Sequence, residues 1–173
     1  MKNNQKYILL ALIAGLLMLP QVAGAFSVNL DPPSVYLTMA PGETQRGVLT
    51  LKNQGKEKSS FKVYTNDWNY LPDGSKQFLP AGKAKYSCAN WLKLDNARFE
   101  LAPGAEQKAY YQITAPLKAS GGYYAVVFFE SVFGVNKENV NLAGRIGTIF
   151  YVEIKDTAKK QGAIKDFQVY QKL

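Results

Sequence analysis

The chain has 173 residues, and its 21 lysines and arginines exceed its 13 aspartates and glutamates, which gives a formal net charge of +8. It contains no histidine and a single cysteine, so the usual nitrogen and sulfur ligands of a metal centre are missing, as are the Ser-His and Cys-His pairs of nucleophilic enzymes. We therefore expect a protein that is not an enzyme and that needs neither a cofactor nor a metal ion.

Residues 1–25 have the pattern of a secretory signal peptide. Two lysines precede an apolar run from Tyr7 to Leu19, and a small-residue site follows at 23–25. The run is shorter than the roughly 20 apolar residues of a membrane-spanning helix, and a proline and a glutamine end it. We predict cleavage after Ala25 and export from the cytoplasm, with no transmembrane segment in the remaining chain.

The remaining residues, 26–173, have the length of one ordinary domain. Removal of the signal would leave 19 basic and 13 acidic residues, a net charge of +6. Such a chain with many tyrosines could stack on RNA bases, but export argues against a nucleic-acid partner. The charge favours solubility first, and contact with anionic envelope surfaces second. Cys88 cannot pair within the chain, so it is either buried or an intermolecular partner, and its apolar neighbours favour burial.

The tripeptide Ala-Pro-Gly occurs twice, at 40–42 and 102–104, each time between extended segments. Proline presets the backbone torsion at the second position of a turn, and glycine accepts the positive torsion that follows. Each copy therefore predicts a strand, a turn and a strand. The segments between the copies do not match, so we interpret the repeat as two equivalent corners of one sandwich, in preference to a duplicated domain.

In chain order, the first extended segment, 27–39, is interrupted by Pro32-Pro33, which fits an edge strand that bends or switches sheets. The segment 123–132 is almost wholly apolar, as in a central strand covered on both faces. The other extended segments lie at 47–53, 60–68, 91–94, 99–101, 108–114 and 140–155. Seven short strands separated by turn signals, without helical periodicity after the signal, predict an all-β, immunoglobulin-like β-sandwich over 26–155.

The last strand is unusually long. Alternation from Val140 to Lys155 amounts to about 50 Å of strand, against a usual length of about 5 or 6 residues. We expect part of it to outrun the sandwich. An ordinary core strand explains the apolar positions from Phe150 onward. It explains Val140 to Ile146 less well, because they follow a loop. For these residues the sequence allows two interpretations, an ordinary sandwich strand and a strand that binds a partner.

Residues 156–173 have a different composition. The first part resembles a linker, and four apolar residues follow, at 164, 167, 169 and 173. This segment either docks on the sandwich or begins a second domain, and we favour the first strand of a second domain.

The order of several motifs resembles the N-terminal domain of the PapD-like periplasmic pilus chaperones. These motifs are Pro41-Gly42 with Leu49, Leu51 and Asn53, then Val63 to Trp68, Trp91-Leu92, Phe99 to Gly104, Gly122 to Glu130, and Ile149 to Tyr151. The resemblance covers roughly 27–155. It implies the PapD-like fold, a periplasmic location, and a role in the assembly of a pilus or fimbrium.

In that family the last strand lends alternating apolar side chains to an incomplete pilus subunit, by strand addition. The resemblance therefore implies a chaperone-like protein whose partner is an exported, pilus-type subunit. The partner-binding residues that it implies are Val140, Leu142, Ile146, Thr148 and Phe150.

In the same family a pair of basic residues binds the C-terminal carboxylate of the subunit. The corresponding two positions of this chain are not basic. Prolines 32 and 33 stand at the first position, and Thr148 stands at the second. Arg145, on the opposite parity of the strand, is the candidate anion anchor. An alternative function is a structural or adhesive envelope module of the same fold, which binds a surface polymer or a neighbouring protein through exposed tyrosine and lysine.

Overall fold

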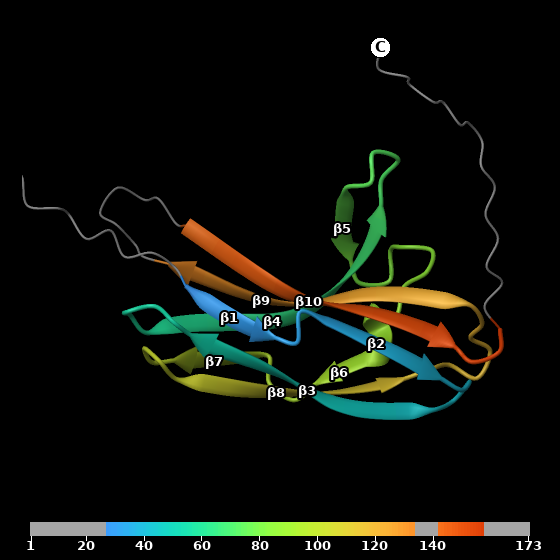
Figure 1. Ribbon diagram of the computed structural model, residues 1–173, viewed down its shortest axis with the longest axis horizontal. Coiled ribbons are helices and arrows are strands. Elements are labelled where there is room, and N and C mark those ends of the chain that lie inside the picture. The colour runs from blue at the N-terminus through green and yellow to red at the C-terminus, as the bar shows by residue number, and fades with distance from the viewer. Residues whose placement is uncertain (1–26, 134–141, 158–173) are drawn as a thin grey trace, which may run out of the picture.

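The structure is a computed structural model that describes residues 27–133 and 142–157, except for the side chains of 132, 133, 142 and 143. Within these ranges two β-sheets pack face to face, which confirms the predicted immunoglobulin-like sandwich (Figure 1). The described strands are β1 (Val28–Asp31), β2 (Ser34–Met39), β3 (Thr44–Asn53), β4 (Ser59–Tyr70), β5 (Lys76–Pro80), β6 (Leu92–Leu94), β7 (Arg98–Leu101), β8 (Glu106–Thr114), β9 (Gly122–Phe133) and β10 (Leu142–Ile154).

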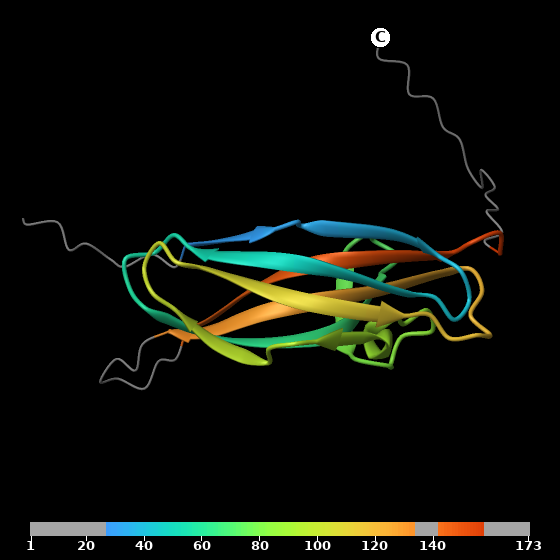
Figure 2. The same ribbon diagram turned by 90° about the horizontal axis from the view of Figure 1, so that it is seen from below.

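One sheet has four strands in the order β1-β3-β8-β6, and the other has the order β2-β10-β9-β4-β5, with β7 also paired to β4. Figure 2 shows β3 and β8 crossing in front of the second sheet. All of these pairs are antiparallel except that of β2 with β10, which is parallel. The sequence predicted a seven-stranded sandwich from eight extended segments, whereas the described residues form ten strands. The two strands beyond those eight segments are β5, which was not predicted, and the one gained because 27–39 is divided into β1 and β2.

The two Ala-Pro-Gly segments are the same kind of turn at equivalent places in the fold. The N–H of Glu43 donates to the carbonyl of Ala40 at 3.1 Å, and Ala105 donates to Ala102 at the same distance. The glycines have φ values of 79° and 74°, which only glycine adopts without strain. The first turn leads from β2 to β3 and the second from β7 to β8, so both pass the chain from the six-stranded to the four-stranded sheet. The prediction of two equivalent corners is confirmed.

The chain changes sheets at the prolines near its start, which is one of the two alternatives that the sequence left open. Before them β1 pairs with β3, and after them β2 pairs with β10 in the opposite sheet. The Asp31-Pro32 peptide bond at the switch is cis. Because Pro32 and Pro33 have no N–H, neither can donate to a β-ladder at this point. The switch makes β1 an edge strand of one sheet and β2 an edge strand of the other.

The main core lies between the sheets, and a second apolar cluster lies on the outer face of the six-stranded sheet. Cys88 is in the main core and is fully buried, so burial is confirmed for the single cysteine. Burial, aided by the negative charge of Asp67, raises the pKa of its thiol far above the usual value. The protonated thiol is therefore an ordinary apolar core group.

The outer cluster forms because β9 is apolar on both faces. Val127 and Phe129 point into the main core, whereas Val126 and Phe128 are buried on the outer face together with Trp68. The end of β4 continues with β5 as a hairpin that rises above the sheet (Figure 1). This arrangement confirms that the segment 123–132 is a central strand covered on both sides.

Several predictions from the sequence lie outside the described residues. They are the signal peptide and its cleavage after Ala25, the donor position Val140, and most of the predicted linker and further strand from 158 onward. In the part of the chain that the structure describes, no helix is both long enough and apolar enough to cross a membrane.

Candidate functional site

The candidate site is one edge of the last strand. β10 pairs with β9 along almost its whole length, from Leu142 to Glu153. On its other side β2 pairs only with Ile149 to Ile154. Among the described residues no strand pairs with this side from Leu142 to Gly147. The last strand was expected to extend beyond the sandwich. It does not extend beyond its pairing with β9, but it does extend beyond its pairing with β2.

Strand periodicity shows which backbone groups point to this unpaired edge. The N–H of Ile149 donates to the carbonyl of Pro33 at 3.1 Å, on the β2 side of β10. Residues two apart in a strand direct their N–H and C=O groups to the same side. Arg145 and Gly147 therefore direct these groups to the unpaired edge, whereas Ile146 directs them to β9. The edge is about 20 Å long, at ~3.3 Å per residue.

The edge is open because the first segment of the chain leaves this sheet at the prolines. β2 begins at Ser34, next to Ile149, and the residues before the prolines belong to the opposite sheet. The hydroxyl of Thr148 donates to the carbonyl of Pro32 at 2.7 Å, and the Thr148 side chain is fully buried. This hydrogen bond joins the switch point to β10 at the place where pairing with β2 ends.

The side chains of the predicted donor series do not all lie at this edge. Thr148 and Phe150 are both fully buried, and the Phe150 ring lies edge-on to Tyr111 with centroids 5.0 Å apart. A side chain that fills the core of this protein cannot also fill a groove in a partner. Ile146 is only half-buried, where it packs against the rim of the core.

For Leu142 the structure describes the backbone alone, which pairs with Phe133. Leu142 has the same strand parity as Ile146, so alternation assigns both residues to one face of β10. The donor role of Leu142 and Ile146 stays a prediction, and the burial of Thr148 and Phe150 makes these two residues part of the core.

Arg145 lies on the outer face, opposite to the donor series, as its parity predicted. Its guanidinium carbon is 4.6 Å from the centroid of the Phe128 ring and 5.6 Å from that of Phe78. The Tyr64 hydroxyl donates to the carboxylate of Glu130, the cross-strand partner of Arg145. Burial first, and this hydrogen bond second, raise the pKa of Tyr64, while Arg145 acts in the opposite direction. Arg145 thus already has aromatic and acidic neighbours, and its role as an anion anchor stays a prediction.

Gly147 is required by packing on the same face. A Cβ atom at this position would lie 2.8 Å from Phe128 Cδ1 and 2.8 Å from Val126 Cγ2. Real Cβ atoms do not approach other carbon atoms so closely. The glycine therefore lets the outer cluster close over β10 beside the unpaired edge.

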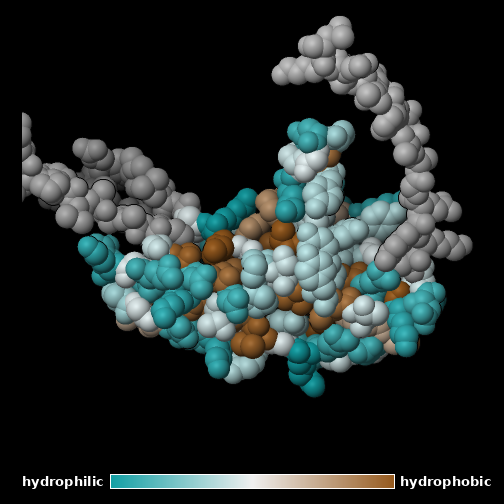
Figure 3. Space-filling model, in the orientation of Figure 1, coloured by the Kyte–Doolittle hydropathy of each residue, from teal (hydrophilic) through white to brown (hydrophobic). Residues whose placement is uncertain are grey.

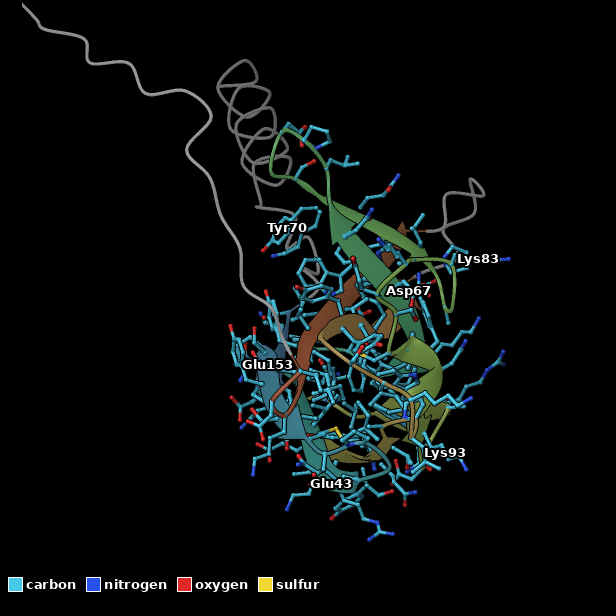
Figure 4. The ribbon with its side chains drawn as sticks, turned by 90° about the vertical axis from the view of Figure 1, so that its right-hand side faces the viewer. Glu43, Asp67, Tyr70, Lys83, Lys93 and Glu153 are labelled. Carbon is cyan, nitrogen blue, oxygen red and sulfur yellow. The ribbon has the colours of Figure 1, made fainter. Side chains whose placement is uncertain are left out.

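The outer face also carries a group of tyrosines, here called the tyrosine surface: Tyr36, Tyr70, Tyr124 and Tyr151. The rings of Tyr36 and Tyr151 stack with centroids 4.7 Å apart and planes 4° apart, and Tyr36 is 74% exposed. Burial, followed by a hydrogen bond with Tyr70, raises the pKa of Tyr151. Figure 3 shows apolar and weakly polar surface below the hairpin, and Figure 4 shows Tyr70 on the same side of the molecule as Glu153.

The buried carboxylate of Asp67, labelled in Figure 4, has a structural explanation. It accepts hydrogen bonds from the N–H of Ala84 at 2.7 Å and from the Ser87 hydroxyl, so it holds the loop after β5 against β4. No three potential metal-ligating side chains gather within 27–133 and 142–157.

Comparison with known proteins supports the fold through structure and not through sequence. No family model matches the chain, and no curated protein matches it. A solved class 5 fimbrial chaperone, CfaA, superposes with a TM-score of 0.52 at 13% identity, covering 75% of this chain and 57% of that one. A chain from the chaperone–tip adhesin complex of CFA/I fimbriae gives 0.51 at 14% identity, with coverages of 77% and 59%.

A chain from the complex of the Salmonella enterica SafA pilin with the SafB chaperone also gives 0.51 at 14% identity, and the match covers 80% of this chain and 59% of that one. This chain thus spans less than two thirds of each of these three solved chains. Identities this low are evidence about the fold. From its own two sheets and these superpositions, the chain has the PapD-like immunoglobulin-like β-sandwich fold that the order of its motifs predicted.

Proposed function

We propose that this protein is a periplasmic, non-catalytic chaperone-like protein that binds an exported pilus-type subunit by strand addition at the edge of β10. The observation that carries the proposal is the edge from Leu142 to Gly147, with which no described strand pairs. In strand addition, main-chain hydrogen bonds supply affinity, and alternate side chains supply fit.

The edge is long, and such edges are hazardous in a soluble protein. Unpaired strand edges template aggregation, so natural proteins shorten them, cover them, or interrupt them with proline or charge. Here the chain passes from one sheet to the other at the two prolines, so β1 pairs with β3 and not with the first half of β10. An edge kept open by the fold itself is best explained by a partner that occupies it.

The solved structures of this fold support the same proposal. One of them is a chaperone–tip adhesin complex of CFA/I fimbriae, and another is a complex of a pilin with its chaperone. For the present chain we assign the corresponding partner class, an exported subunit whose sandwich lacks a strand. Leu142 and Ile146 would be the side chains that enter the partner.

The Leu142→Asp variant should lose most capture of such a subunit. The test co-expresses the chain in a bacterial periplasm with a fimbrial subunit that lacks its last strand, and measures the subunit recovered with the tagged chain. Burying an unpaired carboxylate in the groove of the partner is unfavourable, so we expect recovery to fall by about tenfold or more.

The matched control is Val48→Asp, the same kind of change on β3 of the other sheet, where the side chain is 38% exposed. Both variants should retain the thermal unfolding midpoint of the parent within a few degrees. Full recovery of the subunit by Leu142→Asp would rule out donation from this strand.

The tyrosine surface favours a second candidate function, the envelope module that binds a surface polymer. Exposed tyrosine rings offer flat apolar faces with polar hydroxyl edges. If this surface binds envelope polysaccharide, Tyr36→Ala should reduce co-sedimentation with isolated polysaccharide by about threefold or more. Tyr110→Ala, a 55% exposed tyrosine of β8 in the other sheet, is the control and should bind normally. Equal binding by the two variants would exclude this function for the surface.

A further inference from the structure

Arg145 is the charged residue of the unpaired edge. Strand alternation assigns positions 143, 145 and 147 to the outer face of β10, and the sequence places alanine, arginine and glycine there. Alanine and glycine have no side-chain group that could bind a polar residue. On this face the guanidinium of Arg145 is therefore the group that an added strand would recognise.

Two aromatic rings hold this guanidinium above β10. Its carbon atom is 4.6 Å from the centroid of the Phe128 ring and 5.6 Å from that of Phe78. The Phe128 ring itself lies over β10, because a Cβ atom on Gly147 would be 2.8 Å from one of its atoms. A mobile lysine would be enough to protect an edge from aggregation, whereas a guanidinium held in place is suited to the recognition of a partner.

The charges around Arg145 leave it without an ion pair among the described residues. The carboxylate of its cross-strand neighbour Glu130 accepts a hydrogen bond from the Tyr64 hydroxyl. Beyond β9 the same row continues with Lys62 and Arg98, which lie directly opposite one another on β4 and β7. The row therefore holds three cationic side chains and one carboxylate. Its positive charge favours an anionic group on the open side of β10.

An acidic side chain on an added strand would be within reach of this guanidinium. Neighbouring strands lie about 4.8 Å apart, and residues directly opposite one another have Cβ atoms roughly 4.5–5.5 Å apart. Because the guanidinium is held above β10, a glutamate on the added strand has to bridge a single strand spacing. Guanidinium and carboxylate then form charge-assisted hydrogen bonds, which are stronger than hydrogen bonds between neutral groups.

Building on the proposed strand addition, we propose that the edge of β10 selects a partner strand with an acidic side chain on its outer face, opposite Arg145. The group recognised is a side-chain carboxylate within the strand and not the C-terminal carboxylate of the partner. This ion pair adds to main-chain pairing and does not replace it, so its loss changes the affinity severalfold without abolishing binding. Leu142 and Ile146 have the opposite strand parity, so the ion pair is independent of the donor residues.

The test uses short peptides of alternating valine and threonine with blocked ends, in which one central threonine is replaced by glutamate, glutamine or lysine. The guest residue is then the only charge, and the valine face sets the orientation of the peptide on β10. Binding is measured by NMR titration at low salt, with the backbone amides of Arg145 and Gly147 as reporters. We expect the glutamate peptide to bind about threefold more tightly than the glutamine peptide, and the lysine peptide about threefold more weakly, the usual effect of one cross-strand charge pair.

Two variants of one residue locate the effect. Arg145→Gln should bind the three peptides with nearly equal affinity, because the cation is lost. Arg145→Glu should reverse the order, so that the lysine peptide binds most tightly. The matched control is Lys118→Glu, which makes the same change of net charge in the exposed loop between β8 and β9 and should keep the order of the parent. Added salt should reduce the differences between the peptides.

Equal affinities of the parent for the glutamate and lysine peptides, or a glutamate preference that survives Arg145→Gln, would overturn this inference and leave strand addition intact. A glutamine peptide with a free C-terminal carboxylate is a further probe. If it bound as tightly as the glutamate peptide and with the same dependence on Arg145, the carboxylate recognised would be terminal, and the inference would be wrong. If none of the peptides bound and the subunit capture described above also failed, the proposed function would fall, and the inference with it.

Discussion

Proline at position 145 is expected to abolish capture of a pilus-type subunit, whereas alanine at the same position should preserve it. Both variants lose the guanidinium and its contacts with Phe128 and Phe78. Only proline removes the N–H that Arg145 directs to the unpaired edge, and its ring also obstructs an incoming strand. In the periplasmic co-expression assay, Arg145→Pro should recover at least about tenfold less subunit than Arg145→Ala.

The comparison requires that both variants fold. The N–H of Arg145 lies on the opposite side of the strand from β9, so the proline should leave the β9–β10 ladder in place. Ile146→Pro, one residue along, removes an N–H that faces β9 and should unfold at clearly lower denaturant than the other two variants. Equal subunit recovery by folded Arg145→Pro and Arg145→Ala would show that the partner does not pair with this edge.

Phe150→Ala should lower the free energy of unfolding by about 3–5 kcal/mol, the usual cost of emptying a large aromatic site in a packed core. Phe150 is among the largest fully buried side chains, and its ring packs against Tyr111. It stands in the half of β10 that β2 covers, where its backbone pairs with Val35. Guanidinium chloride unfolding of purified protein measures the loss.

The control for this variant is Leu117→Ala, because Leu117 is 82% exposed and its truncation should change stability by less than about 0.5 kcal/mol. The result decides between two roles for Phe150. If Phe150→Ala unfolded like the parent but captured less subunit, Phe150 would be a donor side chain. Its assignment to the core would then be wrong. A large loss of stability supports the core role that the structure assigns.

Features that depend on a few neighbouring residues were predictable from the sequence. Proline and glycine have narrow torsional preferences, so the two Ala-Pro-Gly turns and the sheet switch at Pro32-Pro33 followed from local chemistry. The apolar run of β9 identified a strand covered on both faces, because each face of a strand must match its surroundings. The order of the motifs along the chain then predicted the fold.

The neighbours of each strand were not predictable in the same way. Alternation shows which residues of β10 share a face, but Ile146 and Phe150 share one and differ in their surroundings. The difference arises because β2 lies beside Phe150 and not beside Ile146. Pairing between segments more than a hundred residues apart depends on the path of the chain through the whole fold. The local sequence pattern does not predict that path.

The sequence, then, was sufficient for the class of fold, the turns, the sheet switch and the alternation of the last strand, because these follow from torsional preference and strand periodicity. The long-range arrangement determined the length of the unpaired edge, the burial of Thr148 and Phe150, and the placing of Glu130 opposite Arg145. These properties depend on register between distant strands, and register is set by the packing of the whole core.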